Sequence, residues 1–359
     1  MGIPNNSIIK SLYSFFILRN NDLGDVLVAT PLLKGLKEAF PDSIVSIGVG
    51  DWAKPLLSNN PYVDEVISCN APWHNKQICN HPANSLKTFF EGLIYALFSK
   101  EARYITKMQF THGIDMLGSR QGSWLLRRCG IPKCYGVKGY AGGDKWCNKN
   151  VVFKENCNVS ESGIKFLSLI DSSIKVEVES RPVLNLSQRE INSAETSWGV
   201  KLPEIKRLII APGGGFPEKC WGDQNYSELT GLLLKNKSFQ ICIIGASEDK
   251  NRIIIHGDYE VLNLCGHLSL RESAAMVSTS DFIVTNSSLS MHLAGAFKIP
   301  SLTLLGDCYA SAELHRKQWG YPEGIILGKE KSEGTSSIAS VIKAYTSIES
   351  LLNTQAIKF

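Results

Sequence analysis

The fold of this chain is decided by residues 11–27, which read Ser11-Leu12-Tyr13-Ser14-Phe15-Phe16-Ile17-Leu18-Arg19-Asn20-Asn21-Asp22-Leu23-Gly24-Asp25-Val26-Leu27. The aromatic and aliphatic run that ends at Leu18 is typical of a buried strand, and the apolar pattern from Leu23 onward is typical of a helix. A polar turn lies between them. In open α/β sheets, ligands bind where strands end in such turns. Asp25, which follows the glycine of this turn, is the first candidate for a functional carboxylate.

The rest of the chain continues this alternation in two series. The predicted strands are 44–50, 63–67, 104–108, 207–211, 240–245, 261–265, 282–285 and 301–306. The predicted helices are 26–40, 52–59, 86–99, 122–128, 160–170, 187–198, 226–234, 270–279, 290–297 and 336–352. Such alternation predicts an α/β protein whose sheets are parallel and covered by helices.

Two further segments are assigned by composition. Residues 109–120 are polar and are predicted to form a loop at the functional edge of the first sheet. The Pro-marked stretch 172–186 is predicted to contain a strand and the interdomain linker. We therefore expect an N-terminal domain at 1–180 and a C-terminal domain at 181–359.

Composition sets the class of protein. The chain has 359 residues, 43% of them hydrophobic and 20% charged, which predicts a soluble globular protein with two domains. A net charge of +4 is too small to indicate nucleic acid as a partner, but it suits acidic small substrates or an anionic membrane surface. No apolar run is long enough to span a bilayer, and no export signal is recognised. We expect a cytoplasmic protein that can touch the cytoplasmic face of the inner membrane.

The ten cysteines are interpreted as reduced thiols. No C-x-x-C pair occurs, and structural zinc sites usually contain such close pairs. A metal or redox role for the group between Cys69 and Cys157 is the weaker alternative. We therefore predict no metal and no cofactor.

Two loops of the second half can bind an anion. Gly213, Gly214 and Gly215 follow a buried strand and allow close approach of the backbone, with Lys219 a few residues on. The alternative is a flexible loop with a solvated lysine. Residues 285–294 run from a strand into a helix whose first N–H groups form an anion site, or are simply capped by the serines there. His292 is interpreted as a packed residue.

Asp25 also has two interpretations. Its carboxylate could stabilise the positive end of the helix dipole, or it could take a proton from an attacking hydroxyl.

Taken together, these loops resemble glycosyltransferase family 9, the bacterial heptosyltransferases. The resemblance covers nearly the whole chain, and its motifs follow one another in the family's order. The similar segments are Arg19-x4-Gly24-Asp25-Val26-Leu27-x3-Pro31, Asn60–Val66, Pro212-Gly213-Gly214 with Lys219 and Trp221, Leu264-Cys265-Gly266 before Ser269–Glu272, and Asn286–Ala296.

The resemblance implies a GT-B architecture, in which two Rossmann-like domains face a central cleft; we also expect the C-terminal helix to pack back on the N-terminal domain. It implies an inverting, metal-independent transfer of a heptose or related sugar from an ADP-sugar donor to a glycan or glycolipid acceptor such as the lipopolysaccharide core. Asp25 resembles the general base. The implied donor-binding residues are Gly213, Gly214, Lys219, Trp221, Asn286, Ser287, Ser288, Leu289, Ser290 and His292. The implied acceptor-binding residues are Arg19, Asn21, Gly24 and Gln109.

The chain departs from the family pattern at four positions. Ser287, Leu289 and Ser290 replace the family's Asp, Gly and Pro, and Gln109 alone matches the family's D-x-Q strand when that strand is placed at 106–109. These departures keep two alternatives open. One is a catalytically altered GT-B-like protein that binds sugar nucleotides, and the other is a nucleotide-sugar epimerase or phosphorylase on the same fold.

Overall fold

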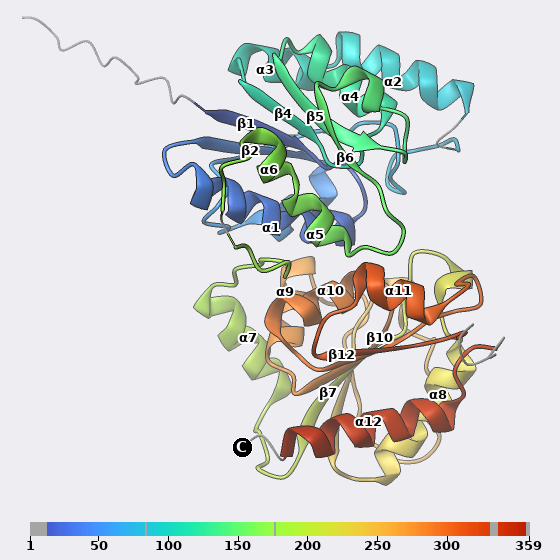
Figure 1. Ribbon diagram of the computed structural model, residues 1–359. Helices are drawn as coiled ribbons and strands as arrows, with labels where there is room; N and C mark the ends of the chain where they lie inside the picture. Colours follow the sequence, from blue (N-terminus) through green and yellow to red (C-terminus); the bar gives the residue numbers. More distant parts are fainter. Residues whose placement is uncertain (1–12, 83–84, 176, 331–336, 357–359) are drawn as a thin grey trace, which may run out of the picture. The chain divides into compact units, whose positions relative to one another are not determined.

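The computed structural model describes residues 13–82, 85–175, 177–330 and 337–356. The chain forms two compact units (Figure 1). The first comprises Met1–Lys154 and Ser160–Ser180, and the second comprises Glu155–Val159 and Arg181–Phe359. Each unit contains one six-stranded sheet in which all strand pairs are parallel.

The first unit is built on β1. Its strands are β1 (Ser14–Leu18), β2 (Ile44–Val49), β3 (Glu65–Ser68), β4 (His112–Asp115), β5 (Lys133–Lys138) and β6 (Lys149–Val152). Its helices are α1 (Leu23–Ala39), α2 (Leu86–Phe98), α3 (Lys100–Met108), α4 (Arg120–Arg128), α5 (Val159–Ile164) and α6 (Phe166–Ile170), with 3-10 turns η1 (Asp51–Leu57) and η2 (Asp144–Trp146). The strand order is β3-β2-β1-β4-β5-β6, so the chain reverses its direction of travel between β1 and β4.

The second unit repeats that plan. Its strands are β7 (Lys206–Ala211), β8 (Phe239–Ile243), β9 (Leu262–Asn263), β10 (Phe282–Asn286), β11 (Ser301–Leu304) and β12 (Gly324–Leu327). Its helices are α7 (Gln188–Trp198), α8 (Asp223–Lys235), α9 (Leu270–Ser278), α10 (Leu289–Phe297), α11 (Ala312–Trp319) and α12 (Val341–Ala356), with 3-10 turns η3 (Pro217–Lys219) and η4 (Ser247–Asp249). The strand order β12-β11-β10-β7-β8-β9 places the reversal between β7 and β10.

The sheet of the first unit is buried on both faces, which explains the unbroken apolar run of β1. Phe15 and Ile17 belong to one core cluster together with Leu33 of α1, whereas Phe16 and Leu18 belong to another, with residues of α3 and α4. Alternate strand residues point to opposite faces. The prediction of a parallel α/β fold is therefore confirmed. Because helices cover both faces of the sheet, residues on both sides of the strand must be apolar.

Helix α1 stays continuous through Pro31. A proline has no N–H, so the carbonyl four residues earlier, that of Leu27, loses its usual helical partner. The Thr30 hydroxyl donates to that carbonyl at 2.6 Å. This side-chain bond replaces the missing backbone bond beneath the proline.

Three predicted elements are wrong. Residues 104–108 belong to helix α3 rather than to a strand, and the predicted loop 109–120 contains β4. No strand is present in the described part of 172–186. Besides β4, three strands and one helix were not predicted: β5, β6, β12 and α11.

The C-terminal helix α12 packs on α8 and β11, and its Ala344 and Ile348 belong to the core of the second unit. This corrects the expectation that it packs on the N-terminal domain. Among the described residues, no helix has the length and apolar character required to cross a membrane.

All ten cysteines are free. Cys69, Cys129 and Cys134 are buried in the first unit, and Cys242 and Cys265 are buried in the second, whereas Cys308 is exposed. Burial raises the pKa of the Cys134 and Cys265 thiols to about 11.

Candidate active site

The turn after β1 holds a charged pair. Arg19 Nη2 donates to Asp25 Oδ1 at 2.8 Å, and Arg19 Nε donates to the Asp25 carbonyl at 3.3 Å. Asp25, with Gly24, lies in the first turn of α1, where the helix dipole favours a negative charge. The Arg19 side chain is 7% exposed, but that of Asp25 is 32% exposed. The carboxylate is therefore fixed through Oδ1 and still reachable from solvent.

Two asparagines tie this turn to the loop after β3. Asn20 Nδ2 donates to the Trp73 carbonyl at 3.1 Å, and Asn21 Nδ2 donates to the His74 carbonyl at 2.7 Å. Burial, together with the nearby charge of Arg19, lowers the pKa of His74. Asn21, predicted to bind the acceptor, is buried and uses its amide to hold this loop.

The neighbouring strand ends in a second carboxylate that was not predicted. Asp115 pairs with Leu18 in register at the end of β4 and is 1% exposed. Its Oδ1 accepts from the N–H groups of Leu117 (3.1 Å) and Gly118 (3.0 Å). Burial raises the pKa of Asp115 to about 6, although these backbone bonds and the positive charge of Arg19 act in the opposite direction.

Asp115 corrects the placement of the acidic strand. Gln109 is the left-handed C-cap of α3, and it precedes β4. Gln109 therefore lies near the edge where the strands begin, whereas Asp25 follows the end of β1. The signal that could have identified Asp115 is an aspartate followed by a glycine-bearing turn and a Ser N-cap, Ser119, which accepts from the Gly122 N–H.

In the second unit, one asparagine joins the predicted loops. Asn286, the last residue of β10, is fully buried. Its Nδ2 donates to the carbonyls of Pro212 (2.6 Å) and Gly213 (3.2 Å), and its Oδ1 accepts from the Trp221 N–H (2.9 Å) and the Tyr226 hydroxyl (3.1 Å). Asn286 thus connects the glycine turn after β7 to the start of α8. All four hydrogen bonds of its side-chain amide are made to other residues of the protein, and they position these loops.

Trp221 has a structural position. Its indole is 1% exposed, packs edge-on against Tyr226, and donates from Nε1 to the Ala339 carbonyl at 2.7 Å. The ring therefore supports the loop from beneath, instead of offering a surface to a ligand.

The turn that carries Lys219 is clamped to the turn after β11. Gly306 donates its N–H to the Lys219 carbonyl, and Cys308 donates to the Glu218 carbonyl, both at 3.2 Å. A Cβ added at Gly306 would lie 2.5 Å from the Cys220 and Glu218 carbonyl oxygens, so only glycine fits there. Lys219 itself is half-buried, and its ammonium lies 5.5 Å from the centre of the Phe216 ring.

Helix α10 begins without a side-chain cap. Ser288 is its N-cap but makes no capping bond; its hydroxyl lies 3.3 Å from that of Thr285. Ser287, Leu289 and Ser290 are half-buried around this start. The first N–H groups of a helix lack intrahelical partners, and together with the helix dipole they attract anions.

His292 lies deeper in this helix. Its Nδ1 is 2.8 Å from the Tyr321 hydroxyl, its ring meets Trp319 edge-on, and burial lowers its pKa to about 4. It is a neutral packing residue at physiological pH.

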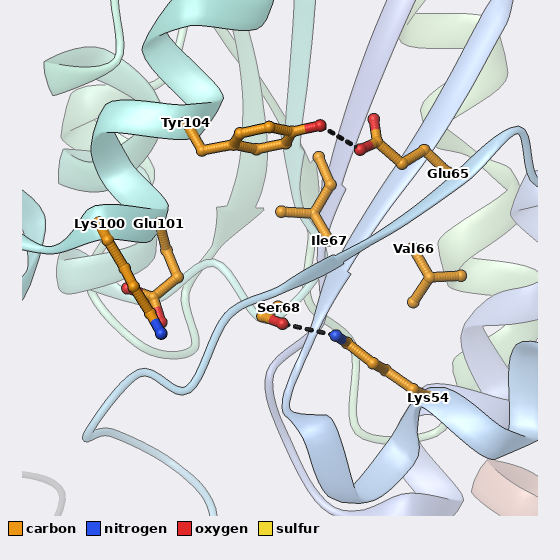
Figure 2. Close-up of a pocket in the computed structure, with 8 residues that line it drawn as sticks. All are labelled: Lys54, Glu65, Val66, Ile67, Ser68, Lys100, Glu101 and Tyr104. Carbon is orange, nitrogen blue, oxygen red and sulfur yellow. Dashed lines mark hydrogen bonds between the residues drawn. The ribbon is translucent and has the colours of Figure 1, made fainter.

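A separate polar pocket lies beside β3, the edge strand of the first sheet (Figure 2). It has a volume of about 380 Å³, and its polar groups are joined to each other: the Tyr104 hydroxyl donates to Glu65, and Lys54 donates to Ser68. Among the described residues, no group of three His, Cys, Asp or Glu side chains is placed to hold a metal ion.

Two parallel sheets of strand order 3-2-1-4-5-6, each with polar groups at its reversal point, are typical of one class of protein, that with the GT-B fold. Known proteins agree with this class. The sequence model of Glycosyltransferase family 9 (heptosyltransferase) matches residues 99–329, more than half of the chain. Lipooligosaccharide heptosyltransferase 2 of Haemophilus ducreyi is 23% identical over 294 residues, which cover 77% of this chain and 78% of that protein.

Solved structures share the fold. The glycosyl transferase family 9 protein of Veillonella parvula aligns with a TM-score of 0.75 at 17% identity, covering 95% of this chain and 98% of that one. The E. coli ADP-heptose lps heptosyltransferase II aligns with a TM-score of 0.72 at 18% identity, covering 96% of this chain and 99% of that one. The chain belongs to glycosyltransferase family 9, as its sequence motifs predicted, and is a transferase.

Proposed function

We propose that this glycosyltransferase moves a heptose from ADP-heptose to a lipopolysaccharide-core acceptor in the cytoplasm, with inversion at the anomeric carbon and without a metal ion. The donor and acceptor are those in the names of its relatives, the heptosyltransferases of Haemophilus ducreyi and E. coli. Residues 1–180 would bind the acceptor and residues 181–359 the donor.

The observation that carries the proposal is the Asn286 contact set. It holds Gly213 against β10, and α10 starts directly after that strand, so uncapped N–H groups and a glycine turn lie together. Backbone N–H groups and helix starts are well suited to a diphosphate. Lys219 is the cation nearest in sequence to this turn and would contact the diphosphate as a point charge.

The reaction is a single displacement. The acceptor hydroxyl oxygen forms a bond to C1 of the heptose, while the bond from C1 to the diphosphate oxygen breaks and its electron pair leaves with ADP. The hydroxyl proton passes to Asp25, at Oδ2, because Oδ1 is held by Arg19. The N–H groups at the start of α10 and Lys219 stabilise the charge that develops on the diphosphate.

Replacing the base tests the mechanism. Asp25→Asn should reduce transfer about 10²–10⁴-fold, the usual loss on removing a general base, with ADP-heptose affinity unchanged. Asp22→Asn is the matched control, since Asp22 lies in the same turn but contacts Lys76 instead. Near-wild-type transfer by Asp25→Asn would show that Asp25 only serves the helix dipole.

Calorimetry tests the donor site, and the transfer assay tests the alternatives. Lys219→Ala should weaken ADP binding in calorimetry, and unchanged affinity would contradict its assignment. A chain that binds ADP-heptose without turnover on any lipopolysaccharide acceptor would instead be a binding protein. Release of a rearranged sugar without acceptor would indicate an epimerase.

A further inference from the structure

Helix α2 runs along the top of the first unit in the view of Figure 1, beside α3 and α4. It packs mainly on α4 and α3. Its inner face consists of Thr88, Gly92 and Ala96, and a Cβ at Gly92 would lie 2.6 Å from Gln121 of α4. The small inner residues therefore allow α2 to sit close on α4, and they leave the bulky residues to the opposite face.

That opposite face is apolar and exposed. Its side chains are Leu86, Phe90, Ile94, Leu97 and Phe98, which are 76%, 56%, 60%, 36% and 67% exposed. We call these five residues the α2 stripe. A surface helix normally turns polar residues outward, and a contiguous exposed apolar patch marks an interaction site.

The stripe continues across neighbouring aromatic residues. Phe89 meets both Phe90 and Trp124 edge-on, and Trp124 in turn meets Trp146, which is 45% exposed. On the other flank, Ile94 and Phe98 line a hollow of about 490 Å³. Aromatic rings with one exposed edge are common where proteins meet the lipid headgroup region.

Positive charges flank the stripe. Lys87 is exposed at its N-terminal end, and Arg103 donates to the Phe98 carbonyl at its C-terminal end, at 3.0 Å. Arg127, exposed, donates to the Trp146 carbonyl at 2.7 Å. Glu91 is the acid on α2, and it faces His81 at 3.6 Å.

We propose that the α2 stripe docks on the surface of an anionic lipid bilayer. With 13 residues, α2 is too short to span the hydrocarbon core, but an apolar face flanked by basic residues lies in the interface of anionic membranes. Two copies of the chain joined through this stripe would bring like charges together, which disfavours a second copy as occupant. The proposal rests on the proposed function, in which the acceptor is a glycolipid held in a membrane.

The test is flotation of the full chain with vesicles of phosphatidylethanolamine and phosphatidylglycerol, without donor or acceptor. Phe90→Ser combined with Ile94→Ser should weaken binding about tenfold or more, because burial of each large apolar side chain in the bilayer contributes to the free energy of binding. The matched control is Val200→Ser with Leu202→Ser, which removes two apolar side chains, 84% and 57% exposed, from the second unit and should leave binding unchanged.

The role of the basic residues is tested independently. Lys87→Glu should weaken binding to these vesicles, and phosphatidylcholine vesicles should bind the wild-type chain less well. Equal binding by the Phe90→Ser, Ile94→Ser variant and the wild type would overturn the proposal. So would self-association without vesicles that the same variant abolishes, because the stripe would then join two copies.

Transfer to a deacylated, water-soluble acceptor separates this proposal from the proposed function. The Phe90→Ser, Ile94→Ser variant should retain wild-type transfer to that acceptor, which also shows that it is folded, and should lose transfer to acceptor embedded in vesicles. Lost transfer to the soluble acceptor with lost circular dichroism signal would make the stripe structural and overturn the docking assignment. A wild-type chain that floats with vesicles but transfers no heptose would refute the function alone.

Discussion

The reversal points of the two sheets have the same topology but opposite chemistry. In the first unit, the ends of β1 and β4 carry Arg19, Asp25 and Asp115, two of them buried and all three ionisable. In the second unit, the ends of β7 and β10 carry glycines and the neutral Asn286. One plan therefore supports a site made of charged side chains and a site made mainly of backbone groups.

The difference matches the chemistry proposed for each half. Proton transfer needs a side chain that can change its charge, so the first unit holds a carboxylate in place with an arginine. A diphosphate is already charged, and neutral N–H groups bind it without introducing an ion that must be desolvated. Substitutions at four positions test this contrast between the two reversal points.

Removing the neutral amide should have the largest effect. Asn286→Ala leaves the Trp221 N–H and the Pro212 carbonyl without their partner in a buried site. We expect a loss of about 3–5 kcal/mol in the free energy of unfolding of the second unit, because each buried unsatisfied group costs about 1–3 kcal/mol. Urea unfolding measures it. Asn192→Ala in α7, which removes an exposed hydrogen bond accepted from Gln188, is the matched control and should change stability by less than about 1 kcal/mol.

If Asn286→Ala proved as mild as the control, Asn286 would not be what positions the second reversal point. The contrast between the two units would then lose its main support.

Neutralising the buried acid should change the response to pH. The pKa of Asp115 in the folded chain, about 6, lies above its ordinary value of 3.8. The favourable contribution of Asp115 to the free energy of unfolding is therefore fully present below pH 3.8, and it is lost as the pH rises through 6. For wild type relative to Asp115→Asn, the free energy of unfolding should fall by about 3 kcal/mol between pH 3.5 and pH 7.5.

Urea unfolding of both chains at the two pH values measures this difference. Asparagine can keep the acceptor oxygen for the Leu117 and Gly118 N–H groups, so the variant should fold. A difference that does not vary with pH would mean that Asp115 is ionised in the folded chain as readily as in the unfolded one.

Filling the close contact at Gly306 should have an intermediate effect. Gly306→Ala forces its Cβ against the carbonyls of Glu218 and Cys220 and should cost about 2 kcal/mol, with weaker ADP binding. In the matched control, Gly231→Ala in α8, a Cβ would meet no atom within 4 Å and should stabilise the helix by about 0.5–1 kcal/mol. Thermal unfolding with and without ADP separates these outcomes. Unchanged ADP affinity in Gly306→Ala would show that this turn does not shape the site.

The smallest effect concerns the helix that carries Asp25. Thr30→Ala removes the hydroxyl that serves the Leu27 carbonyl and should cost about 1 kcal/mol. The cost should shrink in a Pro31→Ala background, where the new N–H supplies the missing bond. A double-mutant cycle in urea measures this coupling. Equal costs in both backgrounds would show that Thr30 stabilises α1 in another way.

Much of the fold could be predicted because its signals are local. The inner strands β1, β7 and β10 each contain a run of three or four apolar residues, as sheets buried on both faces require. Ser187 and Ser269 are N-caps, and each forms a capping box with the glutamate three residues later. Such contacts lie within a few residues, so sequence pattern is sufficient to find them.

The errors arise where packing overrides local preference. Residues 104–106, Tyr-Ile-Thr, favour a strand, but Ser99 caps a helix and Ala102 and Ile105 are buried one helical turn apart. Strand β4 contains a histidine, a glycine and an aspartate, and it is buried all the same because the His112 ring packs against Phe15 and Tyr135. The local sequence pattern does not predict such a strand.

The candidate site was predicted only in part, because it too depends on contacts between residues that are distant in the sequence. The motifs mark loops at the ends of strands, but what each side chain does depends on partners far along the chain. Asn286 reaches Tyr226 and Pro212, which are 60 and 74 residues away. A motif that suggested ligand contact could not show that this amide is fully occupied inside the protein.

The cysteines give each unit its own reporter of local opening. A thiol reacts with labelling reagents only as an exposed thiolate, so the buried, high-pKa Cys134 and Cys265 are silent until the strands around them open. Cys308 is exposed, and its N–H is bonded to the turn that carries Lys219. Pulsed alkylation can therefore time the opening of the two sheets separately. Cys308 can carry a label beside the proposed donor loop, with no residue added to the natural chain.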